Sequence, residues 1–211
     1  NPSRPRRYLP PPGSFVVPTA CEHTLTDHGG TIYGMVPFGA DKVISGSDDR
    51  MIKVWDTTSL ACERTLQTPS GVTSLVLFGD LLFVGLDDGK IMVWNTTSWT
   101  HERTLEGHTN WVTSVTFSPD GQTIASGSGD PFSKNPDNTI RLWNAATGVH
   151  IRTLEGQTNV VNSVTFSPDG ETIASGSSDN TIRLWNAATG AHIRTLEGHA
   201  SGVRSVTFSP R

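Results

Sequence analysis

Short segments that mix apolar and polar residues alternate with turn-forming residues along most of the chain. Three of these segments are rich in Val, Ile, Thr and aromatic residues and are bounded by turns, which predicts β-strands: VNSVTF (161–166), ETIASGS (171–177) and NTIRLW (180–185). A fourth strand is expected at HIRTLE (192–197), and SPDG (167–170) has the residues of a type I turn. No stretch keeps apolar residues at i, i+3, i+4 and i+7, so the sequence predicts an all-β fold.

This four-strand pattern repeats along the chain. Corresponding tryptophans stand at spacings of 39, 49 and 42 residues, at Trp55, Trp94, Trp143 and Trp185. The longest spacing contains a seven-residue insertion, because SGSGDPFSKNPDNTIRLW stands where the next copy has SGSSDNTIRLW. Units of about 42 residues with four antiparallel strands, placed in series, predict a β-propeller.

The repeated unit resembles the WD40 repeat. The resemblance rests on GH, SGSSDNTIRLWN, the Trp-Asp pair at 55–56 and the Trp-Asn pairs at 94–95, 143–144 and 185–186. It covers residues 20–211, with repeats that end near 56, 95, 144 and 186 and a partial repeat at 187–211. The copies from Thr104 onward are similar to WD repeats of fungal and bacterial signalling proteins. Residues 1–19 are rich in Pro and Arg and are expected to form a linker with polyproline II character.

The resemblance implies a WD40-type β-propeller with four complete four-stranded blades and an incomplete terminal blade. ACEHTL (20–25) is expected to be an outer strand without its own blade, and VRSVTF (203–208) an innermost strand without a following one. We therefore expect a fragment of a larger ring, of seven blades in the commonest members of the family. Further sequence or a second chain would complete the ring and cover its end faces.

The resemblance also implies a hydrogen-bonded tetrad in each blade, in which Trp donates to Ser, Ser meets His, and Asp holds His. The first repeat has all four: His28, Ser45, Asp49 and Trp55. The third has His108, Ser126 and Trp143, with Asp130 or Asp137 as the acid, since the insertion splits that turn. The fourth has Ser175, Asp179 and Trp185, with Gln157 in place of His. The second keeps only Asp88 and Trp94, with Pro69 and Val84 at the other places, so we expect its blade to be locally weakest.

A Ser, a His and an Asp in one network also invite a catalytic-triad interpretation. A triad needs an exposed nucleophile and waiting oxyanion donors, whereas this trio recurs at regular spacing with its Ser engaged by an indole N–H. Repetition favours a structural role, and the sequence predicts no enzyme.

Metal, cofactor and disulfide chemistry are not expected either. His101, His150 and His192 occupy equivalent places in successive outer strands, where they splay apart and cannot share one ion. Cys21 and Cys62 are likewise equivalent and too far apart for a disulfide. Free thiols fit a reducing compartment, which favours a cytoplasmic or nuclear protein.

The charge distribution restricts the partners. The net charge is −4, made up of +3 on residues 1–20 and −7 on the remainder, where 13 Lys and Arg face 20 Asp and Glu. A body of that sign repels phosphate, so nucleic acid is not expected as a partner. The longest apolar window, residues 74–86, is interrupted by Asp80 and is too short for a membrane helix, so no membrane association is expected either.

Recognition is expected where the repeats differ. The third copy (107–155) and the fourth (156–197) differ by six substitutions and the insertion, most of them in the loops of one face, which we call the top face. One column of residues runs around the inner edge of that face, five positions after each His position when one deletion is allowed in the second copy: Tyr33, Thr73, Thr113, Asn162 and Arg204. Trp111 is an aromatic in a loop otherwise filled by Val or Gly, which suits an interface anchor or packing against the next blade. Phe132 and Lys134 in the insertion are further candidates, with a tip that has no partner as the alternative.

These features favour a non-catalytic scaffold that presents its top face to a protein or peptide; a sensor module of a signalling protein is one form of this hypothesis. A substrate-receptor subunit of a ubiquitin ligase is an alternative. Such propellers typically carry Arg two residues after the Trp-Asp pair, and here Thr58, Thr97, Ala146 and Ala188 stand there. A propeller hydrolase or lectin would need acids or a metal cluster in the channel, and the inner column contains no acid.

Overall fold

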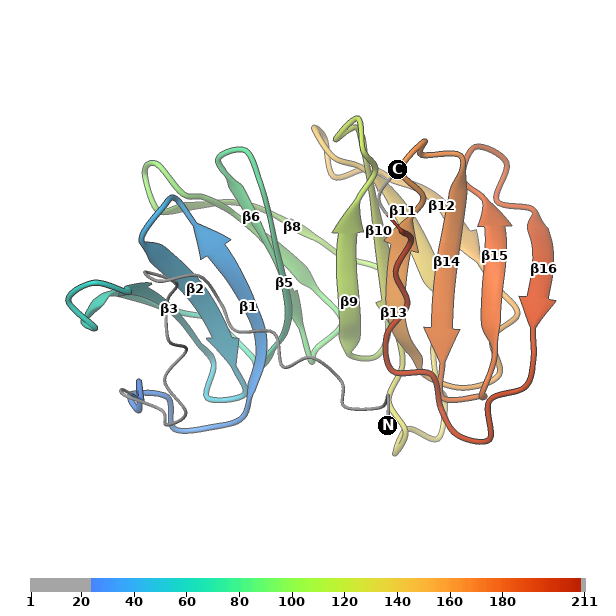
Figure 1. Ribbon diagram of the computed structural model, residues 1–211, viewed down its shortest axis with the longest axis horizontal. Helices are drawn as coiled ribbons and strands as arrows, with labels where there is room; N and C mark the ends of the chain where they lie inside the picture. The colour runs from blue at the N-terminus through green and yellow to red at the C-terminus, as the bar shows by residue number, and fades with distance from the viewer. Residues whose placement is uncertain (1–23, 210–211) are drawn as a thin grey trace, which may run out of the picture.

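The structure is a computed structural model that describes residues 24–209. Within those residues it contains 16 β-strands in four antiparallel four-stranded sheets and no helix (Figure 1), which confirms the predicted all-β propeller architecture. Consecutive strands pair within every sheet, so each sheet is one blade. No helix in the described part of the chain has the length and apolar character to cross a membrane.

The four sheets have nearly equal strand lengths. The first contains β1 (Ile32–Phe38), β2 (Lys42–Ser47), β3 (Met51–Asp56) and β4 (Cys62–Gln67). The second contains β5 (Val72–Phe78), β6 (Leu81–Leu86), β7 (Ile91–Asn95) and β8 (Thr100–Leu105). The third contains β9 (Val112–Phe117), β10 (Thr123–Ser128), β11 (Ile140–Asn144) and β12 (His150–Leu154). The fourth contains β13 (Val161–Phe166), β14 (Thr172–Ser177), β15 (Ile182–Asn186) and β16 (His192–Leu196).

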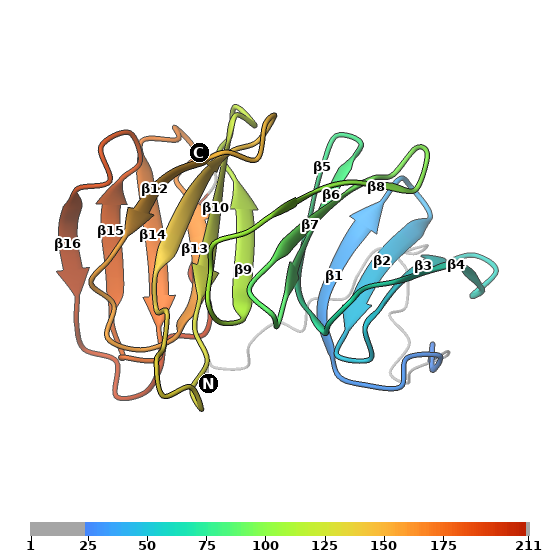
Figure 2. The same ribbon diagram turned by 180° about the vertical axis from the view of Figure 1, so that it is seen from behind.

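The sheets follow one another in chain order across the molecule, with the innermost strands β1, β5, β9 and β13 in contact in that order (Figure 1). Seen from behind, β4 lies at one edge of the molecule and β16 at the other (Figure 2). Among the described residues no extensive contact joins β1 to β13, so the four sheets do not close on each other.

The SPDG turns shape the hairpins between the first two strands of the third and fourth sheets. In the third sheet the Gly121 N–H donates to the Ser118 carbonyl at 2.8 Å. The Ser118 hydroxyl donates to the Asp120 carboxylate at 2.5 Å and accepts the Thr123 N–H at 2.9 Å. The same bonds recur one repeat later, at Ser167. Identical turn sequences therefore produce identical turns.

Apolar side chains fill the seams between neighbouring sheets. Each seam has its own buried cluster, with Leu75 in the first, Val115 in the second and Val164 in the third. A glycine in the second strand allows the close approach. A Cβ on Gly127 would lie 2.8 Å from Val161 Cγ1, which is closer than real Cβ contacts come. The SGS motif thus sets how tightly one sheet rests on the next.

One sequence expectation about strands needs correction. The predicted innermost strand at 203–208 is not a strand, because the described residues provide no neighbouring strand to complete its ladder. The segment still lies where the next blade would begin, since Val203 is buried and Val206 N–H donates to Ser163 Oγ at 3.2 Å. Trp99 lies in the turn before β8, where its ring packs on Phe38 of the first sheet. The segment 20–25 lies mostly outside the described residues, as does Cys21.

Candidate partner-binding site

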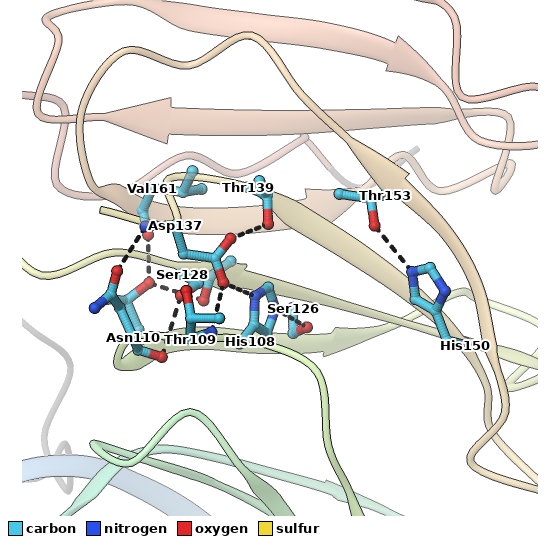
Figure 3. A network of polar contacts seen from close by, with 12 residues as sticks. His108, Thr109, Asn110, Ser126, Ser128, Asp137, Thr139, His150, Thr153 and Val161 are labelled. Carbon is cyan, nitrogen blue, oxygen red and sulfur yellow. Dashed lines mark hydrogen bonds and ion pairs between the residues drawn. The ribbon is translucent and has the colours of Figure 1, made fainter. Parts of the chain in front are cut away.

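The polar network of the third sheet is the reference for the others (Figure 3). His108 Nε2 lies 2.7 Å from Ser126 Oγ, as Figure 3 shows. Trp143 Nε1 donates to the same oxygen at 2.8 Å. His108 Nδ1 lies 2.8 Å from Asp137 Oδ2, so Asp137 and not Asp130 is the acid of this network. Because the carboxylate only accepts, Nδ1 carries the proton and Nε2 accepts the Ser126 hydroxyl proton. Every polar group in this network therefore has a matched partner.

The first sheet repeats this arrangement. His28 lies 2.8 Å from Asp49 Oδ2 and 2.7 Å from Ser45 Oγ, and Trp55 Nε1 donates to Ser45 Oγ at 2.7 Å. In both sheets the residue after the His also donates its backbone N–H to the carboxylate, as Gly29 does at 2.8 Å. The network therefore ties the loop before each sheet to the turn between its second and third strands.

The fourth sheet keeps the network with an amide in place of the imidazole. Gln157 Nε2 donates to Ser175 Oγ at 2.8 Å, and Trp185 Nε1 donates to it at 3.0 Å. Asp179 turns to Thr158 and Thr181 instead, accepting both of their backbone N–H groups at 3.0 Å. The Gln amide donates to the Ser hydroxyl where the His imidazole accepts from it, so Gln can take the place of His without leaving that hydroxyl unpaired.

The second sheet lacks the network. Val84 stands at the Ser position and is fully buried, and Trp94 Nε1 is buried with no hydrogen-bond partner among the described residues. An unpaired buried donor costs about 1–3 kcal/mol. Apolar packing must offset that cost, and Val84 and Trp94 both belong to the cluster between the first two sheets.

The acids of the network are held in their charged form. Burial alone would raise the pKa of Asp137, but hydrogen bonds from His108, Thr139 and the Thr109 backbone outweigh it and hold the pKa well below the usual 3.8. The same balance, with bonds from His28 and Gly29, lowers the pKa of Asp49. Both carboxylates therefore stabilise the fold only while they are ionised.

Acid should weaken this fold through these two carboxylates. A depressed folded-state pKa gives stability that is present above the unfolded pKa near 3.8 and is lost as the pH falls through the folded value. We expect the free energy of unfolding to fall steadily below about pH 5. In urea titrations at several pH values, Asp137→Asn should be less stable at pH 7 and show a shallower acid slope. Asp130→Asn, which removes a carboxylate that does not contact His108, is the control; an equal change of slope in both variants would contradict this assignment.

The network does not present a nucleophile. Ser45, Ser126 and Ser175 are at most 2% exposed, and each oxygen is engaged by an indole N–H. The histidines of the outer strands each have partners within their own sheet. Each bonds a Thr three residues further along the chain and packs edge-on against the Trp of its sheet: His101, His150 and His192. No group of three or more potential metal ligands comes together in the described residues.

The top face contains a cavity of about 360 Å³ at the inner edge of the sheets. It brings together the whole inner column and the loop tryptophan: Tyr33, Thr73, Thr113, Asn162, Arg204 and Trp111. Gly129, Pro131, Val160 and Ser178 complete the lining. Pro131 comes from the insertion, whereas Phe132 is 86% exposed, and neither it nor Lys134 lines the cavity.

Three members of the column bond the innermost segment of the next repeat. Thr73 Oγ1 donates to the Val112 carbonyl at 2.6 Å, and Asn162 Nδ2 donates to the Val203 carbonyl at 2.9 Å. The Thr113 hydroxyl bonds the Val161 carbonyl in the same way. In each case the acceptor is the residue just before the next member of the column. Thr73 and Thr113 therefore link successive sheets, and Asn162 links the fourth sheet to the segment that follows it, a role that sequence reasoning missed.

A second link lies one residue further along each innermost strand. The Val115 N–H donates to Ser74 Oγ at 3.1 Å, and the Val164 N–H donates to Ser114 Oγ at 3.1 Å. The first sheet has neither link, because Tyr33 and Gly34 stand at the corresponding positions. There the chain relies on close contact, and a Cβ on Gly34 would lie 3.1 Å from the Leu75 nitrogen.

The repeats match a family model described as WD domain, G-beta repeat, over residues 19–56, 60–95, 99–144, 148–186 and 190–211. The chain belongs to the WD40 repeat family. This confirms the resemblance drawn from the Trp-Asp and Trp-Asn pairs. WD40 repeats typically form non-catalytic scaffolds that bind proteins.

Two curated proteins are similar to parts of this WD40 chain. A stretch of 57 residues, 27% of the chain, is 40% identical to protein tipD of Dictyostelium discoideum and covers 9% of it. A stretch of 42 residues, 19% of the chain, is 52% identical to vegetative incompatibility protein HET-E-1 of Podospora anserina and covers 3% of it. The matches thus span less than a tenth of either relative.

Proposed function

We propose that this WD40 chain is a non-catalytic scaffold that binds a protein or peptide partner at the cavity of its top face. The observation that carries the proposal is the meeting of Trp111 and the variable inner column around one cavity. A rigid framework with differing side chains at one opening is the usual arrangement of a recognition surface. A sensor module of a signalling protein is one setting in which such a surface would act.

Trp111 is the anchor in this proposal, since it is half-buried at the cavity and contributes a large aromatic surface. Trp111→Ala should reduce the recovery of peptides from a random phage-displayed library by about tenfold or more, because interface anchors contribute about 2 kcal/mol or more. Val149→Ala is the matched control, because it truncates a side chain that is 62% exposed and does not line the cavity.

Thermal unfolding of both variants separates the two roles open to Trp111. A lower melting temperature with unchanged peptide recovery would mean that Trp111 packs the blades and would contradict the proposed site. Reduced recovery with an unchanged melting temperature would support it.

The proposal includes three expectations about context. The acidic body of the chain disfavours nucleic acid and anionic membrane surfaces as partners. The free thiol of Cys62 fits a cytoplasmic or nuclear location, where thiols stay reduced. Exposed Ile32 and Met35 on β1 would be covered by further blades or by a second copy. The mass of the protein in solution distinguishes further blades in the same chain from a second copy of the chain.

A further inference from the structure

Some polar side chains that line the top-face cavity already have hydrogen-bond acceptors, and others do not. The donors of Thr73, Thr113 and Asn162 already bond backbone carbonyls of the next repeat. Arg204 is exposed, and no hydrogen bond or ion pair joins its guanidinium to any other described residue. The guanidinium therefore presents donors that a ligand can meet.

The charge of the cavity lining has one sign. Arg204 is the only charged residue among its ten lining residues, and none of them is acidic. This cation stands out because residues 21–211 carry a net charge of −7. On the same face, but outside the lining, Asp48 and Asp87 place carboxylate oxygens 2.9 Å and 2.8 Å from the position of a Cβ on Gly71. These two carboxylates lie beside the first two sheets. Asp130 and Asp179, next in sequence to lining residues of the third and fourth sheets, already accept hydrogen bonds from backbone N–H groups.

The lining also offers apolar surface. Trp111, Pro131 and Val160 lie around the same cavity as Arg204. Trp111 and Pro131 provide most of this apolar surface, since Val160 is only 5% exposed. A ligand that fits would combine an anion for the guanidinium with an apolar group for the indole. A planar guanidinium binds carboxylates through paired N–H donors, which makes it well suited to that anion.

We propose that the cavity binds a peptide through an Asp or Glu side chain seated on Arg204, with an adjacent apolar residue of the peptide packed on Trp111. This inference rests on the proposed function and specifies the partner as an acidic peptide.

Three synthetic peptide pools test the proposal. Each has a fixed central residue (Glu, Gln or Lys), Leu or Phe on either side of it, randomised flanks without charge, and blocked ends. Retention on the immobilised full chain is measured at low and high salt. We expect the Glu pool to be retained about tenfold more than the Gln pool, since hydrogen bonds to charged groups contribute about 1.5–3 kcal/mol. The preference should shrink at high salt.

Variants assign the preference to one residue. Arg204→Ala should remove the preference for Glu, and Arg204→Glu should transfer it to the Lys pool. Arg194→Ala is the matched control, since Arg194 is an exposed arginine of β16 that does not line the cavity.

The outcomes separate this inference from the proposed function. Retention that depends on Trp111 but is equal for all three pools, or highest for Lys, would overturn the acidic-peptide inference and leave the proposed function standing. Retention only of peptides with a free C-terminal carboxylate would overturn the side-chain assignment. No retention of any pool would overturn both.

Discussion

Ser126→Ala is expected to lower the free energy of unfolding by about 2–6 kcal/mol, because it leaves two buried polar groups unpaired at about 1–3 kcal/mol each. Trp143 Nε1 would lose its only acceptor and His108 Nε2 its hydroxyl donor, in a site where Ser126 is fully buried. Urea unfolding followed by tryptophan fluorescence measures the loss. Amide hydrogen exchange should place the change in β9–β12, because stability in a repeat fold is largely local.

The matched control is another Ser→Ala change. Ser98 also bonds a hydroxyl, that of Thr100 at 2.7 Å, but it is exposed and water can replace the bond. Ser98→Ala should change stability by less than about 0.5 kcal/mol. If Ser126→Ala proved equally mild, the hydrogen bonds of Ser126 to Trp143 and His108 would not stabilise the third sheet.

Gly89→Ala should be similarly severe, on the order of 3 kcal/mol or more, for two reasons that act together. Gly89 has a φ of +86°, which L side chains rarely adopt. A Cβ there would also lie 2.4 Å from the His108 carbonyl oxygen, and a backbone atom cannot rotate away as a side chain can. The added methyl group would push the second sheet away from the loop that carries His108. Urea unfolding again measures the loss.

Gly79 separates the two reasons. Its φ is +55°, but a Cβ at that position meets nothing within 4 Å. Gly79→Ala should therefore cost only the conformational term, about 1 kcal/mol. Equal losses at Gly79 and Gly89 would mean that the close approach to His108 contributes nothing.

The fold could be predicted from the sequence because the same pattern of strands and turns occurs in several repeats. Strand-forming segments, SPDG turns and equally spaced tryptophans agree with one another from copy to copy, and the four sheets follow them. Where the copies are interrupted, prediction became less definite. The insertion left Asp130 and Asp137 equivalent in sequence, and only the distance to His108 distinguishes them.

The cavity could be predicted only in part, for a geometric reason. Counting five residues from each His position, with one deletion allowed in the second copy, identifies side chains at the same inner edge, and that column does line one cavity. The count cannot tell whether a side chain there faces a ligand or the carbonyl of the next sheet. Thr73 and Asn162 meet carbonyls that lie 39 and 41 residues away, a relation set by how the sheets stack. Arg204 and Trp111 retain the freedom to bind a partner.

The seam between the first two sheets differs from the others in how it should respond to temperature. The Ser and Thr bonds that join the later sheets are missing where Tyr33 and Gly34 stand. The buried cluster of eight aliphatic residues joins the first two sheets without these bonds, whereas the later seams have both. Attraction between apolar surfaces fades on cooling, whereas direct hydrogen bonds do not share that dependence. Chilling should therefore loosen the first sheet while the remaining three stay joined, which makes the N-terminal blade the cold-sensitive part of the molecule.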